Sequence, residues 1–262
     1  ELALAEKVPL NQSVAELRSV IRERADFHPA WKGLGLIYRR NGDPERAAEA
    51  LTRCVELRPG VPEAVYELAL IRANQNRAPE VLRLLEPLLL EYPDFVSAHY
   101  LCGTVLGQTG RFQEAAAHLK AVFNLDPDHE SCLKNMVAAF TQAGQVAELK
   151  SVLEGHLQKA PESARVRQAL AVLLATCPDP SVQNVAEAVR LLEPFTTGEA
   201  ADPSLMLILG SLYFGAGQLD AAHSLASRAR DLAEQAGKEE LVAALDRLLE
   251  RVRLAADVLP EK

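Results

Sequence analysis

Apolar residues recur along this chain in pairs of helical stripes that short polar turns separate. In residues 28–59 the two stripes comprise Trp31, Leu34, Ile37 and Tyr38, and then Ala47, Ala48, Leu51 and Val55. Spacings of three and four residues place side chains on one face of an α-helix. Between the stripes, Gly42 suits a left-handed helix end and Asp43 suits the cap of the next helix. The pattern predicts two helices joined by a tight turn.

The paired stripes recur with a period of 34 residues. Four prolines mark this period: Pro59, Pro93, Pro127 and Pro161. Residues with small or medium-sized side chains recur at the same interval: Gly35, Ala69, Gly103, Val137 and Ala171. Several residue series that share one period indicate a repeat protein, in which each unit buries its apolar faces against its neighbours.

The unit at 28–61 resembles the tetratricopeptide repeat (TPR) family, whose pattern is W-x2-L-G-x2-Y followed by a small residue and a proline. The matching residues are Trp31, Leu34, Gly35, Tyr38, Ala47 and Pro59. The resemblance extends over nearly the whole chain. It implies an all-α fold, a right-handed α-solenoid of antiparallel helix pairs.

The period divides the chain into six units, 28–61, 62–95, 96–129, 130–163, 164–202 and 203–236. Residues 1–27 are predicted to be a truncated N-terminal repeat, mainly its second helix, with residues 1–7 as a stub of the first. Residues 237–262 are predicted to form a capping helix and tail, because a stack of repeats needs a polar end.

Prolines and one insertion interrupt this regularity. Pro87 is predicted to kink a helix that continues beyond it, and Pro194 to end one. The unit 164–202 is longer than the others, and its extra residues are expected in the turn ATCPDPSVQN (175–184). Asp179 and Pro180 are expected to restart the helix there as N-cap and first residue.

Composition and charge narrow the classes of partner. The 262-residue chain has a net charge of −8, which argues against general nucleic-acid binding, since phosphates require a basic surface. No apolar run approaches the roughly 20 residues that span a bilayer. No signal peptide is recognisable. The chain does not begin with Met, which leaves a processed secreted or periplasmic protein open, so the compartment is undetermined.

Catalysis and metal binding find little support in the sequence. The four cysteines, Cys54, Cys102, Cys132 and Cys177, show no zinc or haem spacing, and free thiols are favoured over two disulfides. The six histidines make no i,i+3 or i,i+4 pair, so no helical metal site is expected. Cys177 would need a histidine from another unit, such as His156, to act as a nucleophile. An incidental thiol in an insertion loop is the favoured interpretation, with no cofactor and no enzymatic activity.

The TPR resemblance implies that the first helix of each unit lines a concave groove. The residues carried over to this lining are Lys32, Arg39, Arg40, Tyr66, Asn74, Tyr100, Gln108, Lys134, Asn135, Gln142, Arg165 and Gln168. Amides can hydrogen-bond an extended backbone, tyrosines offer rigid contact area, and cations can meet acidic side chains. The expected function is a non-catalytic scaffold that binds a peptide segment or partner subunit, with acidic residues among its contacts.

Two other readings of the same residues stay open. A plain solvated helix face would carry similar polar side chains. The chain could also be a structural subunit of a larger complex, acting through its ends or convex face and packing through the truncated N-terminal repeat.

Overall fold

The computed structural model describes residues 10–129, 131–197 and 201–258, and within them all regular structure is helical. The chain divides into two compact units, residues 1–143 and 144–262, each of which is described by itself below. The predicted helix stub at residues 1–7 lies outside the described residues. The all-α prediction is confirmed.

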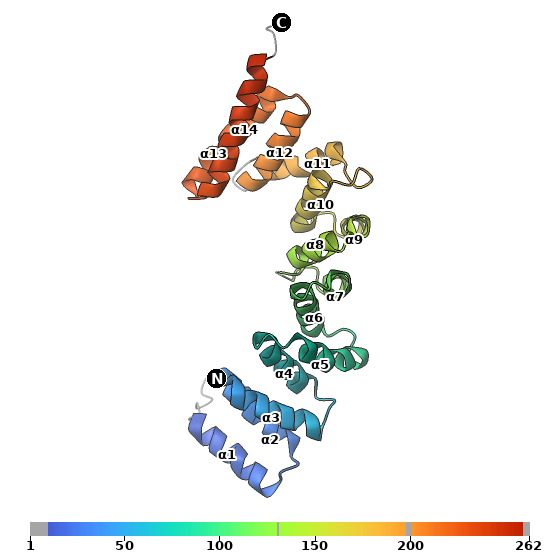
Figure 1. The fold of residues 1–262 in the computed structure, drawn as a ribbon, viewed down its shortest axis with the longest axis vertical. Helices are drawn as coiled ribbons and strands as arrows, with labels where there is room; N and C mark the ends of the chain where they lie inside the picture. The colour runs from blue at the N-terminus through green and yellow to red at the C-terminus, as the bar shows by residue number, and fades with distance from the viewer. Residues whose placement is uncertain (1–9, 130, 198–200, 259–262) are drawn as a thin grey trace, which may run out of the picture. The chain divides into compact units, whose positions relative to one another are not determined.

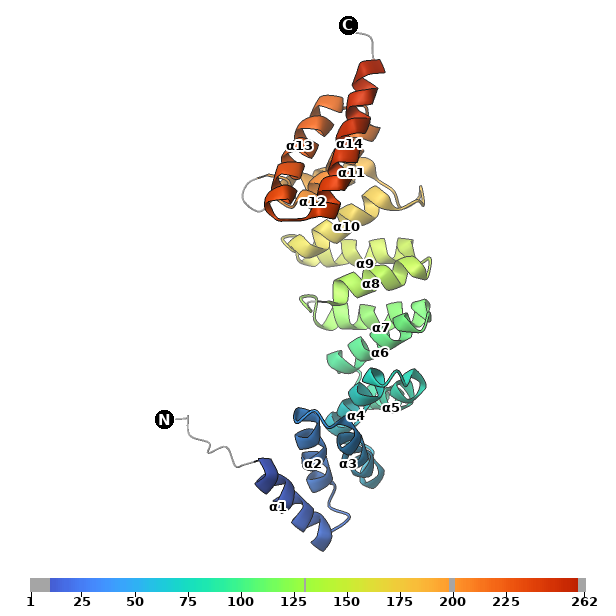
Figure 2. The same cartoon turned by 60° about the vertical axis from the view of Figure 1, so that its left-hand side comes forward.

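The first unit is a succession of antiparallel helix pairs. Its helices are α1 (Leu10–Glu23), α2 (His28–Arg40), α3 (Pro44–Leu57), α4 (Pro62–Asn74), α5 (Ala78–Glu91), α6 (Val96–Gln108), α7 (Phe112–Leu125) and α8 (Cys132–Gln142). Each helix packs against the next in chain order, and α2 with α3 and α6 with α7 lie side by side in both views (Figure 1, Figure 2). The first helices of successive repeats also touch, α4 with α6 and α6 with α8. We call the exposed side of α2, α4, α6 and α8 the first-helix surface.

The turns within the pairs repeat one backbone conformation. Gly42, Asn76, Gly110 and Gly144 lie one period apart, and all four have φ between +58° and +78°. Glycine enters this left-handed region without steric cost, and asparagine tolerates it better than most residues. Beyond the first of these turns, the Asp43 side chain accepts a hydrogen bond from the Arg46 amide at 3.1 Å. The predicted turn chemistry at Gly42 and Asp43 is confirmed.

Close approach of the paired helices depends on glycines in the first helix. A Cβ added at Gly35 would lie 2.6 Å from Leu51 Cγ, and one added at Gly103 would lie 2.7 Å from Leu119 Cγ. Both leucines are fully buried. In these two repeats the glycine leaves room for the leucine of the second helix, whereas other repeats hold alanine or valine at this position.

The prolines act on their helices in different ways. α5 continues through Pro87 to Glu91, and it buries Leu88 and Leu89 beyond the proline. In contrast, α11 (Val185–Leu192) ends shortly before Pro194, and a 3₁₀ turn, η1 (Glu193–Phe195), follows. Continuation of the helix past Pro87 and its termination at Pro194 were both predicted, and the kink at Pro87 stays a prediction.

The second unit begins with α9 (Val146–Lys159) and α10 (Ala164–Thr176), and after α11 and η1 it ends with α12 (Pro203–Gly215), α13 (Leu219–Gln235) and α14 (Glu239–Val258). α14 packs against α12 and α13. The buried face of α13 is a stripe of alanines, Ala222, Ala226, Ala229 and Ala233, and its apolar partners on α14 are Leu245, Leu248 and Val252. The helices that the sequence assigns to repeat 130–163, α8 and α9, belong to different units, so the repeat boundaries stay predictions.

The expectation for residues 175–184 is wrong in one respect. α11 begins only at Val185, with Asn184 as its cap, and residues 177–184 form a loop. Asp179 caps a local turn instead, since its Oδ1 accepts hydrogen bonds from the Ser181 amide at 2.9 Å and hydroxyl at 2.7 Å. The loop folds back because Val182 is buried and the Asn184 amide donates to the carbonyl of Leu174 in α10 at 3.1 Å. Burial of one valine outweighs the local helix-start signal.

Candidate functional site

Two of the predicted cationic groove residues are paired within the chain. Lys32 Nζ lies 2.6 Å from Glu63 Oε2, and Arg39 Nε lies 2.6 Å from Glu67 Oε2. Both glutamates belong to α4, the first helix of the next repeat. Burial raises the pKa of Glu67, whose side chain is only 12% exposed, while Arg39 lowers it. The cationic character expected from α2 alone is therefore largely balanced by α4.

The two predicted tyrosines are half-buried and carry structural contacts. The Tyr66 ring lies 5.3 Å from the Phe95 ring, measured between centroids, and the Tyr100 ring lies 4.4 Å from that of His129. The Tyr100 hydroxyl also accepts a hydrogen bond from Asn135 Nδ2 at 3.0 Å. Tyr100 and Asn135 thus join α6 to α8.

Beside this link, the structure places a hollow of about 330 Å³ between α6, α7 and α8. Its lining residues are Gly103, Thr104, Gly107, Gln108, Phe112, Leu119, Asn135, Ala138, Ala139 and Gln142. We call it the amide hollow, because the predicted groove residues Gln108, Asn135 and Gln142 meet there. None of the lining side chains is ionisable.

Small side chains explain why the amide hollow exists. Two periods earlier in the sequence, the positions of Gly107 and Asn135 are held by Arg39 and Glu67, which form the ion pair described above. The other replacements follow the same trend: Leu36 becomes Thr104, Leu70 becomes Ala138, and Ile71 becomes Ala139. Larger side chains thus hold these positions on α2 and α4, and smaller ones hold them on α6 and α8, where the hollow lies.

The amide hollow is suited to hydrogen bonding with an uncharged ligand. Primary amides both donate and accept hydrogen bonds, so they can pair with the N–H and C=O groups of a polypeptide backbone. The Thr104 hydroxyl donates to the Tyr100 carbonyl at 2.9 Å, which leaves its oxygen as an acceptor. The small residues allow a ligand to approach the helix backbones closely. Gly107, Phe112 and Ala138 were missed by the sequence analysis, although a glycine at a helical position facing another first helix is a usable signal.

The remaining predicted groove residues lie elsewhere. Arg40, Asn74 and Lys134 are exposed on α2, α4 and α8 and do not line the amide hollow. Arg165 and Gln168 are on α10 in the second unit. The structure thus gathers a part of the predicted set in one place.

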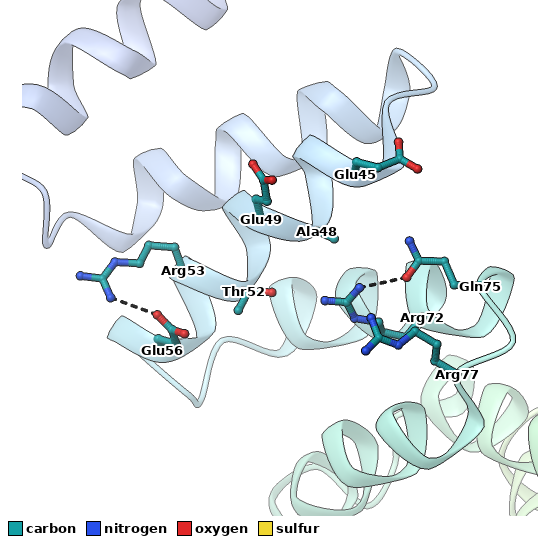
Figure 3. Close-up of a pocket in the computed structure, with 9 residues that line it drawn as sticks. All are labelled: Glu45, Ala48, Glu49, Thr52, Arg53, Glu56, Arg72, Gln75 and Arg77. Carbon is teal, nitrogen blue, oxygen red and sulfur yellow. Dashed lines mark hydrogen bonds and ion pairs between the residues drawn. The ribbon is translucent and has the colours of Figure 1, made fainter.

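A larger hollow of about 690 Å³ lies between α3 and the turn that joins α4 to α5 (Figure 3). Glu45, Glu49, Arg53 and Glu56 project from α3, and Arg72, Gln75 and Arg77 line the opposite side. The arginines already have partners: Arg53 pairs with Glu56 at 3.0 Å, Arg72 with Glu80 at 3.2 Å, and Arg77 with Glu80 at 2.5 Å. A ligand would have to displace these ion pairs, so we favour the amide hollow.

The thiols occupy interior positions. All four cysteines are free and buried. Burial raises the pKa of Cys102 and of Cys132 to about 12, so both remain protonated at neutral pH. Within residues 10–129, 131–197 and 201–258, no three His, Cys, Asp or Glu side chains are grouped as a metal site. No helix in that part of the chain is both long and apolar enough to cross a membrane.

Comparison with known families agrees with this architecture. A tetratricopeptide repeat model matches residues 38–103 and 108–173, and a second model of the same description matches residues 11–62. The chain belongs to the tetratricopeptide repeat family. Members of this family are protein–protein interaction scaffolds and are typically non-catalytic.

Solved TPR structures share the fold at low sequence identity. A crystal structure of MamA is 18% identical, with a TM-score of 0.52 over 60% of this chain and 85% of that one. The pilF protein of Pseudomonas aeruginosa is 20% identical, with a TM-score of 0.51 over 81% and 97%. YrrB, described as a TPR protein with an unusual peptide-binding site, is 16% identical, with a TM-score of 0.50 over 61% and 82%.

One curated relative is much longer than this chain. The protein O-mannosyl-transferase Tmtc3 of Drosophila melanogaster is 21% identical over 164 residues, which are 62% of this chain and 18% of that protein.

Proposed function

We propose that this TPR chain binds an extended segment of a partner protein on the first-helix surface, with the amide hollow as the anchoring subsite. The observation that carries the proposal is the convergence of Gln108, Asn135 and Gln142 on a hollow without ionisable side chains. The peptide-binding site ascribed to YrrB makes a peptide ligand compatible with the shared fold.

The chemistry of the amide hollow favours an uncharged stretch of the partner. A carboxylate or ammonium group placed there would lose hydration without meeting an opposite charge, which costs free energy. Backbone amides and short polar or apolar side chains would bind without this penalty. Acidic residues of the partner, if present, would flank this stretch and meet the exposed side chains of Arg40 and Lys134.

The test selects peptides from a random 12-residue phage-displayed library on the full chain and measures their affinity for two matched variants. Ala138→Leu fills the amide hollow from an exposed position of α8, and Ala117→Leu makes the same change at an exposed position of α7 outside it. We expect Ala138→Leu to weaken binding at least tenfold and Ala117→Leu to leave it unchanged. Selected peptides that bind both variants equally would refute the amide hollow as the subsite and favour assembly through the ends or convex face.

A further inference from the structure

Two histidines from different helices of one repeat face each other in the first unit. His99 on α6 and His118 on α7 place their Nδ1 atoms 3.0 Å apart, and both side chains are partly buried. Their ring centroids are 5.2 Å apart. The pair joins the two helices at the level of Tyr100, one residue beyond His99.

The hydrogen-bond pattern determines where the protons lie. His99 Nε2 is 2.9 Å from the carbonyl oxygen of Pro93, which can only accept, so Nε2 carries a proton and donates. In the neutral His99 ring, Nδ1 is then an acceptor with its lone pair directed at His118. The proton between the two rings belongs to His118 Nδ1. A single proton therefore occupies the space between two imidazole nitrogens.

The geometry points to a metal-binding site in which a divalent, imidazole-preferring cation such as Zn²⁺ bridges His99 Nδ1 and His118 Nδ1. Metal–nitrogen bonds of about 2.0–2.1 Å at a tetrahedral angle separate the two nitrogens by about 3.3 Å. The observed 3.0 Å is close to this separation, and on metal binding the two rings would turn so that both lone pairs point at the metal. On metal binding, the proton moves from Nδ1 of His118 to its Nε2, and the ring stays neutral.

The surroundings of the pair match those of metal-binding histidines. A ligand imidazole normally donates its second N–H to a carbonyl or carboxylate, which orients the ring, and the Pro93 carbonyl does this for His99. Burial, and then the proximity of His99, lower the pKa of His118, which favours the neutral form that binds metals. Glu114 stands one helical turn before His118 and opposes this shift, but its carboxylate is held by Arg111 at 2.5 and 2.7 Å. Water would complete the coordination.

The pair is not visible as a metal-ligand spacing in the sequence. The two histidines are 19 residues apart on different helices and meet only through the packing of α6 on α7. The inference does not depend on the proposed peptide site, since none of its residues lines the amide hollow.

The test titrates the chelator-treated full chain with ZnCl₂ by calorimetry at pH 7.5. We expect one Zn²⁺ per chain, with affinity at least tenfold weaker in His99→Gln and in His118→Gln. Mutation of groups that only hydrogen-bond to a metal ligand already lowers metal affinity about 10–100-fold, so loss of a ligand itself should cost at least as much. His223→Gln, at an exposed histidine of α13, is the matched control and should bind as the unaltered chain does. No binding, or equal binding by all variants, would show that the pair is a hydrogen bond only.

A second measurement keeps the inference testable if either variant fails to fold. In the unaltered chain, Zn²⁺ should shift the side-chain ¹⁵Nδ1 resonances of His99 and His118 and leave those of the other histidines in place. Shifts confined to other histidines would overturn the assignment.

Discussion

The α2–α4 and α6–α8 parts of the first-helix surface are built on the same repeat positions and yet differ in structure. Between α2 and α4, Arg39 and Glu67 reach across and neutralise each other at 2.6 Å. Between α6 and α8, the corresponding positions hold Gly107 and Asn135, and a hollow remains. We call the α2–α4 interface, which the ion pair bridges, the closed region, and the α6–α8 interface, which contains the amide hollow, the open region. The side chains at a few recurring positions therefore decide whether a repeat interface carries an ion pair or a hollow.

The largest effect on stability is expected from alanine substitutions at two glycines of the open region, which should change stability in opposite directions. Gly103→Ala should destabilise the chain by about 1–3 kcal/mol, because the new Cβ would lie 2.7 Å from the branch atom of the buried Leu119. Gly107→Ala meets its nearest atom at 4.0 Å and should instead stabilise α6 by up to about 1 kcal/mol. Urea unfolding followed by circular dichroism compares the two. Equal changes in the free energy of unfolding would contradict the packing argument.

Placing the ion pair of the closed region at the equivalent positions of the open region should weaken peptide binding. The double variant Gly107→Arg, Asn135→Glu recreates the Arg39–Glu67 arrangement between α6 and α8. We expect the affinity for a peptide selected on the unaltered chain to fall at least tenfold, because the pair fills the amide hollow. Stability should fall by about 0.5–1.5 kcal/mol, because Asn135→Glu also removes the amide that donates to the Tyr100 hydroxyl, and a partly exposed ion pair contributes little in return. Retained affinity would mean that the peptide binds elsewhere.

Removing the Arg39–Glu67 ion pair of the closed region should lower stability in a pH-dependent way. Arg39→Gln leaves the poorly exposed Glu67 without its cation and should cost about 1–2 kcal/mol at pH 7. The pKa of Glu67 is already raised by burial, and the substitution removes the influence that lowers it. A carboxyl whose pKa is higher in the folded state destabilises it when ionised, and this penalty disappears as the pH falls through the folded pKa towards the unfolded value of about 4.3.

The stability difference between Arg39→Gln and the unaltered chain should therefore be largest at neutral pH and shrink as the solution is acidified. Urea titrations at several pH values measure it. A difference that stays constant with pH would show that Arg39 acts by packing alone. Arg40→Gln, at the adjacent exposed position, is the control and should have no such dependence.

The smallest expected effect concerns the link between α6 and α8. Tyr100→Phe removes the hydroxyl that accepts from Asn135 Nδ2 and should cost about 0.5–1.5 kcal/mol, while the ring keeps its contact with His129. Chemical denaturation measures the loss. A Tyr100→Phe chain as stable as the original would indicate that water replaces the hydroxyl for Asn135.

Much of the fold could be predicted from local chemistry. The 34-residue period, the left-handed turn at Gly42 and the helix end before Pro194 all depend on properties of single residues or their near neighbours. The loop at 175–184 could not be predicted in this way. Its helix-start signal at Asp179 is overruled by the burial of Val182 and by the hydrogen bond from the Asn184 amide to the Leu174 carbonyl. The candidate site was predicted in part, since the amides were identified but their common hollow was not.

The sequence by itself determined the repeat, the helix pairs and the family, because periodic burial and turn conformation depend on residues that are only a few positions apart. Only the tertiary structure decided which polar groups meet. Lys32 and Arg39 appeared as available cations until α4 placed Glu63 and Glu67 beside them. His99 and His118 became neighbours through the packing of α6 on α7. Pairing of charges and opening of a hollow depend on side chains from adjacent helices, which no single stretch of the chain contains.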